Sequence, residues 1–308
     1  MVFYEEIIPV NKNRREHHHT KVGDLCMKVG FIGAGKVGCS LGAYFVHQGI
    51  QVVGFTSRSE TSAKEAGKLT HTQHISNIES LVTICDVLFI TVSDDSIASV
   101  WEQIKTLPIQ GKFICHCSGS LSSTIFSGIE STGAYGYSIH PMFPFQSKTI
   151  PYEELSQAVI CVEGDTRKLE DVFTLFSCLP NEAIFVKTKE KAKYHGAAVF
   201  ASNLVVALME EAIELLEECG FTRENAIKAL KPLAMQNLNH IFESGPKEAL
   251  TGPVERNDMG TVQKHLEVFS KEERDMYLLL SKKLVKIAKE KHKETDYQKM
   301  QRLLEEEK

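Results

Sequence analysis

The sequence predicts an α/β fold in which a mostly parallel sheet is followed by an all-helical C-terminal domain. From Met27 to about Thr188, apolar strand-like segments alternate with helical segments, a pattern typical of a parallel sheet covered on both faces. From Lys189 onward, apolar residues recur at helical spacing, and no further strand is expected. The third observation is a glycine-rich turn between the first strand and the first helix.

These patterns divide the chain into three parts. Residues 1–26 are mainly polar, include three successive histidines and are expected to form a flexible extension outside the fold. Residues 27–188 form the predicted sheet domain, and residues 189–308 form the predicted helical domain. A substrate is expected in the cleft between these two domains, beside the carboxyl ends of the strands.

The elements are expected in a fixed order along the chain. Strands are predicted at residues 28–32, 51–56, 87–92, 112–117, 135–140, 158–163 and 183–187. Helices are predicted at residues 40–46, 61–68, 96–105, 121–129 and 166–177, and then at 189–219, 223–229, 232–243, 258–269 and 271–290. The last stretch, residues 291–308, is highly charged and is expected to fray.

The glycine-rich turn has the pattern G-x-G-x-x-G and consists of Gly33, Ala34, Gly35, Lys36, Val37 and Gly38. Gly33 permits a tight turn, Gly35 lets the backbone approach a pyrophosphate, and Gly38 lets the following helix pack on the strand. The helix N-terminus then offers unpaired N–H groups to the phosphates. In this strand–turn–helix context, the six residues predict a Rossmann-type domain that binds a dinucleotide.

The end of the second strand indicates which dinucleotide binds. Sites for NAD usually place Asp or Glu there, whereas sites for NADP replace the carboxylate and add an arginine for the 2′-phosphate. Here the strand ends in Ser57, Arg58 and Ser59, which can donate hydrogen bonds to that phosphate. The sequence therefore favours NADP, while Glu60 leaves NAD open as the alternative.

Two further strand ends are expected beside the cofactor. Val92, Ser93 and Asp94 lie at the end of a buried strand and should lie along the ribose and nicotinamide, although helix capping is favoured over catalysis for Asp94. Ser118 and Gly119 end the following strand and are expected near the nicotinamide or the substrate. The alternative for Ser118 is a hydrogen bond that caps its own turn.

Candidate catalytic residues come from a strand end and from the long helix. His140 ends a strand just before Pro141, where an imidazole can polarise or protonate a substrate oxygen. On the helix, Lys191, His195 and Ser202 are expected to share one stripe with Asn203 beside it. A proton donor and an amide facing a cleft suit carbonyl reduction, and the alternative is a hydrogen-bonded network within the core.

A polar cluster in the helical domain supplies two more candidates. Arg256 can bind a substrate carboxylate bidentately, or it forms a surface salt bridge. Asp258 is a further candidate for substrate binding, but it is also well placed to cap the helix that follows it.

Composition excludes several classes of function. The chain has 308 residues, a net charge of −5 and no concentrated basic face, which argues against a nucleic-acid partner. No apolar stretch approaches the length of a membrane span.

The 8 cysteines are scattered, which fits a reducing cytoplasm. In Cys115-His116-Cys117, strand alternation turns His116 away from the two thiols, so no metal is expected.

The chain resembles a family that joins a Rossmann-like NADP-binding domain to a helical domain of unknown function, number 2520. The resemblance extends from Met27 to about His265. It is carried by the segments 33–38, 116–119, 140–145, 193–198, 202–203 and 250–258.

That family is similar to ketopantoate reductases, β-hydroxyacid dehydrogenases, pyrroline-carboxylate reductases and prephenate dehydrogenases. In the β-hydroxyacid group, the first long helix of the second domain carries a catalytic Lys and, one turn later, an Asn. Aligned on Glu211-Ala212, His195 occupies the Lys position and Val199 the Asn position, so this pair is absent here. Prephenate dehydrogenases share a His-Pro-Met motif that resembles His140-Pro141-Met142, although Phe143 replaces the glycine that follows it there.

These resemblances imply an NADPH-dependent reductase of a small 2-oxo acid, with ketopantoate as the leading substrate. His195 would donate the proton, tuned by Lys191, while Asn203 orients the carbonyl and Arg256 holds the carboxylate. The alternatives are a prephenate-type dehydrogenase with His140 as base, a pyrroline-carboxylate-reductase-like enzyme, and a sensor that binds NADP without turnover. Related folds imply a homodimer formed through the helical domain.

Overall fold

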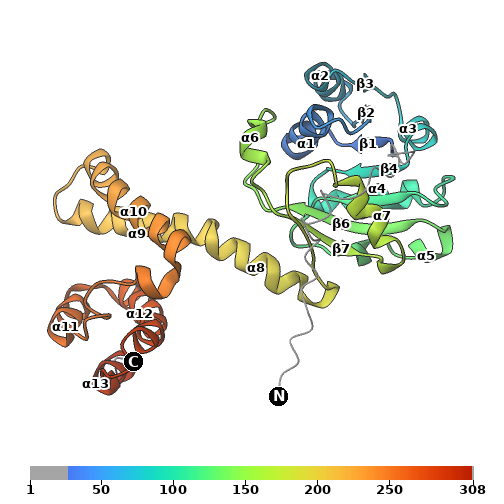
Figure 1. Cartoon of the computed structure of the whole chain (residues 1–308). Helices are drawn as coiled ribbons and strands as arrows, with labels where there is room; N and C mark the ends of the chain where they lie inside the picture. Colours follow the sequence, from blue (N-terminus) through green and yellow to red (C-terminus); the bar gives the residue numbers. More distant parts are fainter. Residues whose placement is uncertain (1–26, 307–308) are drawn as a thin grey trace, which may run out of the picture. The chain divides into compact units, whose positions relative to one another are not determined.

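The computed structural model describes residues 27–306, so the predicted N-terminal extension lies outside the described residues. The chain divides into two compact units, the first ending at Phe200 and the second beginning at Ala201 (Figure 1). The first unit contains the sheet together with the first helix beyond it. The domain boundary that the sequence predicts near Thr188 stays a prediction.

An eight-stranded sheet forms the first unit, in the order β3-β2-β1-β4-β5-β6-β7-β8. Neighbouring strands are parallel except for β6 and β7, which pair antiparallel. The strands are β1 (Val29–Ile32), β2 (Val52–Thr56), β3 (Gln73–His74), β4 (Val87–Ile90), β5 (Phe113–His116), β6 (Tyr135–Pro141), β7 (Ile160–Gly164) and β8 (Ala183–Phe185). The α/β class and the mostly parallel sheet are as predicted.

Helices cover both faces of this sheet because successive strand residues alternate between two apolar clusters. Phe31 and Phe89 face a cluster with α1, α2, α6 and α7, whereas Leu88 and Ile90 face a cluster with α3 and α4. The helical segments of this unit are α1 (Lys36–His47), α2 (Glu60–Thr70), α3 (Ile78–Ile84), α4 (Asp94–Ile104), η2 (Ser123–Ile125), α5 (Ile129–Thr132), α6 (Tyr152–Leu155), η3 (Thr166–Lys168), α7 (Leu169–Leu175), η4 (Thr188–Glu190) and α8 (Lys191–Ala201).

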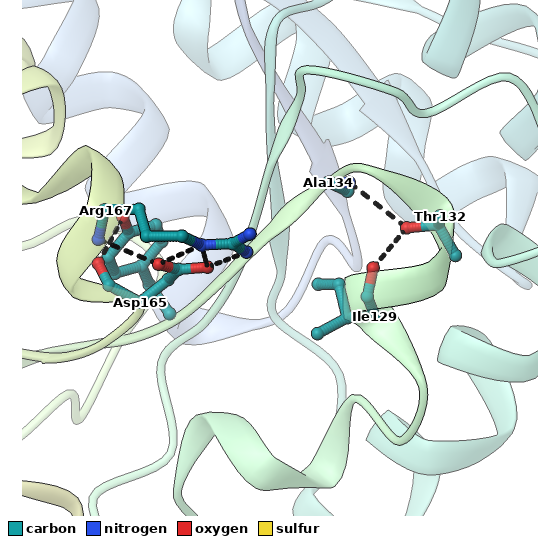
Figure 2. Close-up of polar contacts among 6 residues, drawn as sticks. Ile129, Thr132, Ala134, Asp165 and Arg167 are labelled. Carbon is teal, nitrogen blue, oxygen red and sulfur yellow. Dashed lines mark hydrogen bonds and ion pairs between the residues drawn. The ribbon is translucent and has the colours of Figure 1, made fainter.

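The predicted helix over residues 121–129 is wrong, because the structure holds two short turns there, η2 and α5. Gly128 separates them in the left-handed region, with φ of 77°. Thr132 ends α5: its hydroxyl donates to the Ile129 carbonyl and accepts from the Ala134 N–H, so the chain can turn into β6 (Figure 2).

The antiparallel strand β7 ends in an ion pair. The Arg167 guanidinium binds the Asp165 carboxylate through several N–H groups (Figure 2). The same guanidinium lies over the ring of Tyr135, at 5.2 Å from its centre, where β6 begins. Because β6 and β7 run in opposite directions, this pair lies at the edge of the sheet opposite to the carboxyl end of β6.

The second unit is all helical, as predicted, but its helices begin and end at different residues. They are α9 (Asn203–Glu218), α10 (Arg223–Ala249), α11 (Met259–Val268), α12 (Lys271–Lys291) and α13 (Gln298–Glu306). The single helix expected over residues 189–219 is interrupted at Ser202, whose φ of −127° and ψ of −78° are not helical. Pro232 was expected to begin a helix but lies inside α10, which instead kinks at Gly245.

The expectation that residues 291–308 fray is wrong for the part that the structure describes. Met300 and Leu304 of α13, with Tyr297 just before it, are almost fully buried against α11 and α12. The charged residues Lys299, Arg302 and Glu305 of α13 are exposed. Charge alone therefore misleads here, because the apolar residues recur at helical spacing.

Candidate nucleotide and substrate site

The glycine turn after β1 is shaped by contacts inside the protein at two of its three glycines. Gly33 has φ of +111°, and a Cβ there would lie 2.7 Å from the Thr91 carbonyl oxygen. A Cβ on Gly38 would lie 2.4 Å from Thr91 Oγ1 and 2.5 Å from the Gly33 carbonyl oxygen. Any side chain at either position would therefore force the turn away from β4.

Gly35 differs, because nothing in the described protein requires a glycine there. An added Cβ would meet only the Thr91 carbonyl oxygen, at 4.0 Å, and the backbone has φ of −81°. Gly35 is the N-cap of α1 and provides no side-chain cap, so the first N–H groups of this helix face outward. The sheet order reverses at β1, between β2 and β4, which is where nucleotides bind in such sheets. The turn fits a pyrophosphate.

At the end of β2, the three residues predicted to bind a 2′-phosphate have different surroundings. Ser57 is half-buried, and Arg58 is exposed with no ion pair to any described residue. Ser59 caps α2, since its hydroxyl oxygen accepts the N–H of Ser62 at 3.3 Å. The carboxylate of Glu60 is paired with Lys64 at 2.6 Å.

One interpretation of the sequence was that Asp94 caps α4, and this interpretation is wrong. Asp94 is the first residue of that helix, and its carboxylate accepts hydrogen bonds from Ser118 Oγ at 2.7 Å and Ser120 Oγ at 3.0 Å. The predicted cofactor residue Ser93 is the N-cap but makes no capping side-chain bond, and Val92 packs against the α4 side of the core. Asp94 thus ties the end of β4 to the turn after β5.

Ser118 also stabilises its own turn, which was the alternative to its predicted place beside the nicotinamide or substrate. Its hydroxyl oxygen accepts the backbone N–H of Leu121 at 3.0 Å and of Ser120 at 3.2 Å. The backbone N–H of Ser118 in turn donates to Nδ1 of His116 at 3.2 Å. His116 is fully buried, and burial lowers its pKa to about 4. Its Nε2 then carries the proton and donates to the Ser122 carbonyl, so His116 is a neutral structural residue.

Two imidazoles meet at Gly119, the residue that follows Ser118. A Cβ on Gly119 would lie 2.7 Å from Nδ1 of His195 and 3.0 Å from Nε2 of His140. The Nδ1 atom of His195 is buried and has no hydrogen-bond partner. A buried polar atom without a partner is costly, and such atoms often mark a place where a ligand binds. On its other side, His140 Nδ1 lies 2.6 Å from the hydroxyl of Tyr194.

Lys191 is more deeply buried than the sequence indicated, with 2% of its surface exposed. Its ammonium donates to Ser138 Oγ at 2.7 Å, and Ser138 Oγ donates to the Ser118 carbonyl at 3.1 Å. Desolvation lowers the pKa of Lys191, and the charge of Glu163 partly offsets that effect. Lys191 therefore holds the turn that carries Ser118 and Gly119.

Glu163 was missed by the sequence interpretation. It is fully buried in β7, and its carboxylate accepts hydrogen bonds from the N–H and hydroxyl of Ser123 and from the hydroxyl of Thr188. A lone glutamate inside an apolar strand was the available signal, because such a residue requires buried partners.

The remaining predicted site residues belong to the second unit. Ser202 lies at the break between α8 and α9, so the prediction that it shares one helical stripe with Lys191 and His195 is wrong. The Ser202 hydroxyl donates to Asn203 Oδ1 at 3.0 Å. Arg256 is exposed. Asp258 caps α11 by accepting the N–H and hydroxyl of Thr261. Their roles toward a substrate stay predictions.

Residues 27–306 were also expected to lack a metal site and a membrane span. No three His, Cys, Asp or Glu side chains in that range are grouped so that they could hold a metal ion. Every helix in the same range is too short or too polar to cross a bilayer. Cys115 faces the α1 side of the sheet while His116 contacts Phe126 on the opposite side, as strand alternation predicted.

A glycine turn at the reversal point of a parallel sheet defines a Rossmann-like protein. Residues 14–141 match the family described as a Rossmann-like domain, and residues 158–284 match the one described as Domain of unknown function (DUF2520). The chain therefore combines a Rossmann-like domain with a DUF2520 domain, as its resemblance implied. None of the curated proteins matches the chain.

Solved structures share this architecture over most of the chain. A protein from Thermotoga maritima is 25% identical, with a TM-score of 0.67 over 86% of this chain and 99% of that chain. A pyrroline-5-carboxylate reductase from Coxiella burnetii is 14% identical, with a TM-score of 0.55 over 86% and 98%. A reductive aminase from Aspergillus terreus, solved with NADPH and ethyl-5-oxohexanoate, is 15% identical, with a TM-score of 0.57 over 91% and 93%. The fold is one that NADPH-binding oxidoreductases share.

Proposed function

We propose that the protein is an NADPH-dependent oxidoreductase that reduces a small 2-oxo acid, with ketopantoate as the first candidate. The observation that carries this proposal is the meeting of His140 and His195 at Gly119. This point follows β5, on the same edge of the sheet as the glycine turn after β1. Acid–base groups and a nucleotide-binding turn at one edge are what hydride transfer to a carbonyl requires.

The residues at the strand ends would hold the cofactor in a defined way. The turn from Gly33 to Gly38 and the N–H groups of α1 suit its pyrophosphate, and Arg58 suits the 2′-phosphate. Gly119 would lie beside the nicotinamide. When bound, the nicotinamide would supply the hydride, and the protein would supply the proton and the hydrogen bonds to the substrate oxygen.

The protein would then stabilise the negative charge that forms on the substrate oxygen and supply the proton that this oxygen accepts. Negative charge grows on that oxygen as the carbonyl is reduced, and hydrogen bonds at that point lower the barrier. His195, whose Nδ1 has no protein partner, is the proposed proton donor. Lys191 stabilises the turn through Ser138, which donates to the Ser118 carbonyl.

NADPH oxidation, followed at its absorbance band, tests this function. The panel contains ketopantoate, other 2-oxo acids and pyrroline-carboxylate, with NADH run in parallel and NADP⁺ with prephenate as the reverse assay. Saturable turnover of a 2-oxo acid supports the proposal. Turnover of the cyclic imine or of prephenate alone overturns the substrate class, and tight NADPH binding without turnover of any compound indicates a sensor.

The proposed preference for NADPH predicts the effect of one substitution. Arg58→Gln is expected to weaken NADPH binding by about 10- to 100-fold, since hydrogen bonds to charged groups contribute about 1.5–3 kcal/mol. NADH binding should be unchanged, because NADH has no 2′-phosphate. Fluorescence titration with both nucleotides measures the two dissociation constants.

Arg167→Gln is the matched control for Arg58→Gln, because Arg167 is exposed at the opposite edge of the sheet. It should leave both affinities at the wild-type values. A wild-type protein that prefers NADH would instead assign the ribose to Glu60.

The proposal includes a homodimer formed through the helical unit. Large apolar side chains on α9 and α10 are exposed, among them Val206 at 71%, Leu233 at 69% and Phe242 at 83%. Apolar surface of this extent is usually covered in solution. Phe242→Asp is expected to convert a dimer to a monomer in analytical ultracentrifugation, and a monomeric wild-type protein at micromolar concentration would contradict the dimer.

The proposal also places the protein in the cytoplasm. All cysteines among residues 27–306 are free thiols, which suits a reducing compartment.

A further inference from the structure

Tyr194 contacts the imidazole of His140 directly and is not among the residues of the proposed function. It lies on α8 between Lys191 and His195, and its hydroxyl is 2.6 Å from His140 Nδ1. Its ring is nearly perpendicular to the imidazole, at 85°, and Lys191 Nζ lies 5.2 Å from the centre of the ring. Which group donates in this contact depends on which nitrogen of His140 carries a proton.

The length of the contact indicates the donor. A bond in which an imidazole N–H donates to oxygen is typically 2.7–3.2 Å long, with a mode near 2.9–3.0 Å, whereas hydroxyl donors come closer. At 2.6 Å, the contact suits the Tyr194 hydroxyl donating to an unprotonated Nδ1.

The surrounding groups support the same arrangement of protons. Burial raises the pKa of Tyr194, so the phenol keeps its proton. Burial also raises the pKa of Cys161, which lies opposite His140 in the strand pairing and is near Tyr194. A neutral thiol is a weak acceptor, so it competes little with His140 for the phenol proton.

His140 itself is neutral at physiological pH. Burial, with the charges of Lys191 and His195, lowers its pKa to about 4; His116 acts in the same direction, and Asp94 opposes it. A neutral imidazole whose Nδ1 accepts a hydrogen bond must carry its proton on Nε2. Nε2 is the atom that faces Gly119.

We propose that Tyr194 is a positioning residue that fixes His140 with its proton on Nε2, so that His140 donates a hydrogen bond to the substrate oxygen while His195 transfers the proton. This division of roles rests on the proposed function. In the reduction, the hydride forms the new C–H bond and the carbonyl π electrons move to oxygen. The protonated Nδ1 of His195 gives its proton to that oxygen and becomes neutral, and His140 keeps its own proton.

The test is the tautomer of His140 in the protein without substrate, read from two-bond ¹H–¹⁵N spectra of histidine-labelled protein. His140→Gln assigns the signals. The expected wild-type result is a single tautomer protonated on Nε2 between pH 6 and 8. A His140 protonated on Nδ1 overturns the proposal, and this readout does not depend on finding the substrate.

Tyr194→Phe removes the phenol hydroxyl and keeps the ring. A hydrogen bond to the neutral imidazole disfavours its charged form, so the pKa of His140 is expected to rise in this variant and both tautomers to appear. Turnover of the substrate found in the panel should fall by about tenfold, without a change in NADPH affinity. An unchanged His140 pKa and tautomer in Tyr194→Phe would overturn the positioning role.

The second unit provides a matched control. Tyr277 lies with its hydroxyl 3.0 Å from His265 Nδ1 and with the two rings at 90°, which repeats the geometry of the pair in the site. Tyr277→Phe should leave the His140 signals unchanged. If no compound in the panel turns over, the proposed function fails, whereas the tautomer result still stands or falls by itself.

Discussion

Replacing His195 by glutamine is expected to lower kcat by about 10²- to 10⁴-fold, the usual contribution of a positioned general acid. Glutamine can still form hydrogen bonds beside Gly119, but it has no proton to transfer near neutral pH. The buried Nδ1 of His195 has no partner in the protein, so its loss should not disturb other contacts. The affinity for NADPH should therefore stay at the wild-type value, and the measurement is single-turnover oxidation of bound NADPH.

His47→Gln is a suitable control, since His47 lies at the end of α1 remote from the glycine turn and stacks on Tyr152. It should retain full activity. A His195→Gln variant with wild-type turnover would remove His195 as the acid. Loss of NADPH binding together with turnover would show instead that His195 supports the structure of the site.

A pair of glycine substitutions should separate folding from nucleotide binding. Gly38→Ala is expected to destabilise the protein by about 1–3 kcal/mol, the range for forced overpacking, because its Cβ would meet Thr91 and the Gly33 backbone. Gly35→Ala should leave stability near the wild-type value, since the space around it is open. It should nevertheless weaken NADPH binding by tenfold or more, about 1.4 kcal/mol, because the new methyl group occupies the space for the pyrophosphate.

Thermal unfolding and NADPH titration of both variants measure the two effects independently. The expected outcome is a lowered Tm for Gly38→Ala alone and a raised NADPH dissociation constant for Gly35→Ala at an unchanged Tm. Wild-type NADPH affinity in Gly35→Ala would contradict the assignment of the turn to the pyrophosphate.

The sequence predicted the sheet domain well because its signals are local. Apolar runs such as residues 87–90 are bounded by turn residues, and the glycine turn identifies its neighbours without any information from elsewhere in the chain. The helix break at Ser202 was missed because the apolar periodicity continues across it. The burial of α13 was missed because its many charges hid a narrow apolar stripe.

The candidate residues could be chosen from the sequence one by one, but their arrangement could not. His140, Lys191 and His195 stood out by type and position, and their roles stay predictions. Their partners are distant in sequence: Ser138 is 53 residues from Lys191, and Tyr194 is 54 residues from His140. No local pattern shows which of several polar groups meet once the sheet has formed.

The reversed direction of β7 has a consequence for how this site can be altered. A parallel strand brings only its last residues to the edge where the reaction is proposed, whereas β7 arrives there with its first residues. Cys161 thereby lies opposite His140 and near Tyr194. In the proposed arrangement, the first residues of β7 can influence the basicity of His140 through Tyr194. Substitution of Cys161 by Ser or Ala would therefore change the surroundings of that imidazole without replacing a residue that is proposed to contact the reactants.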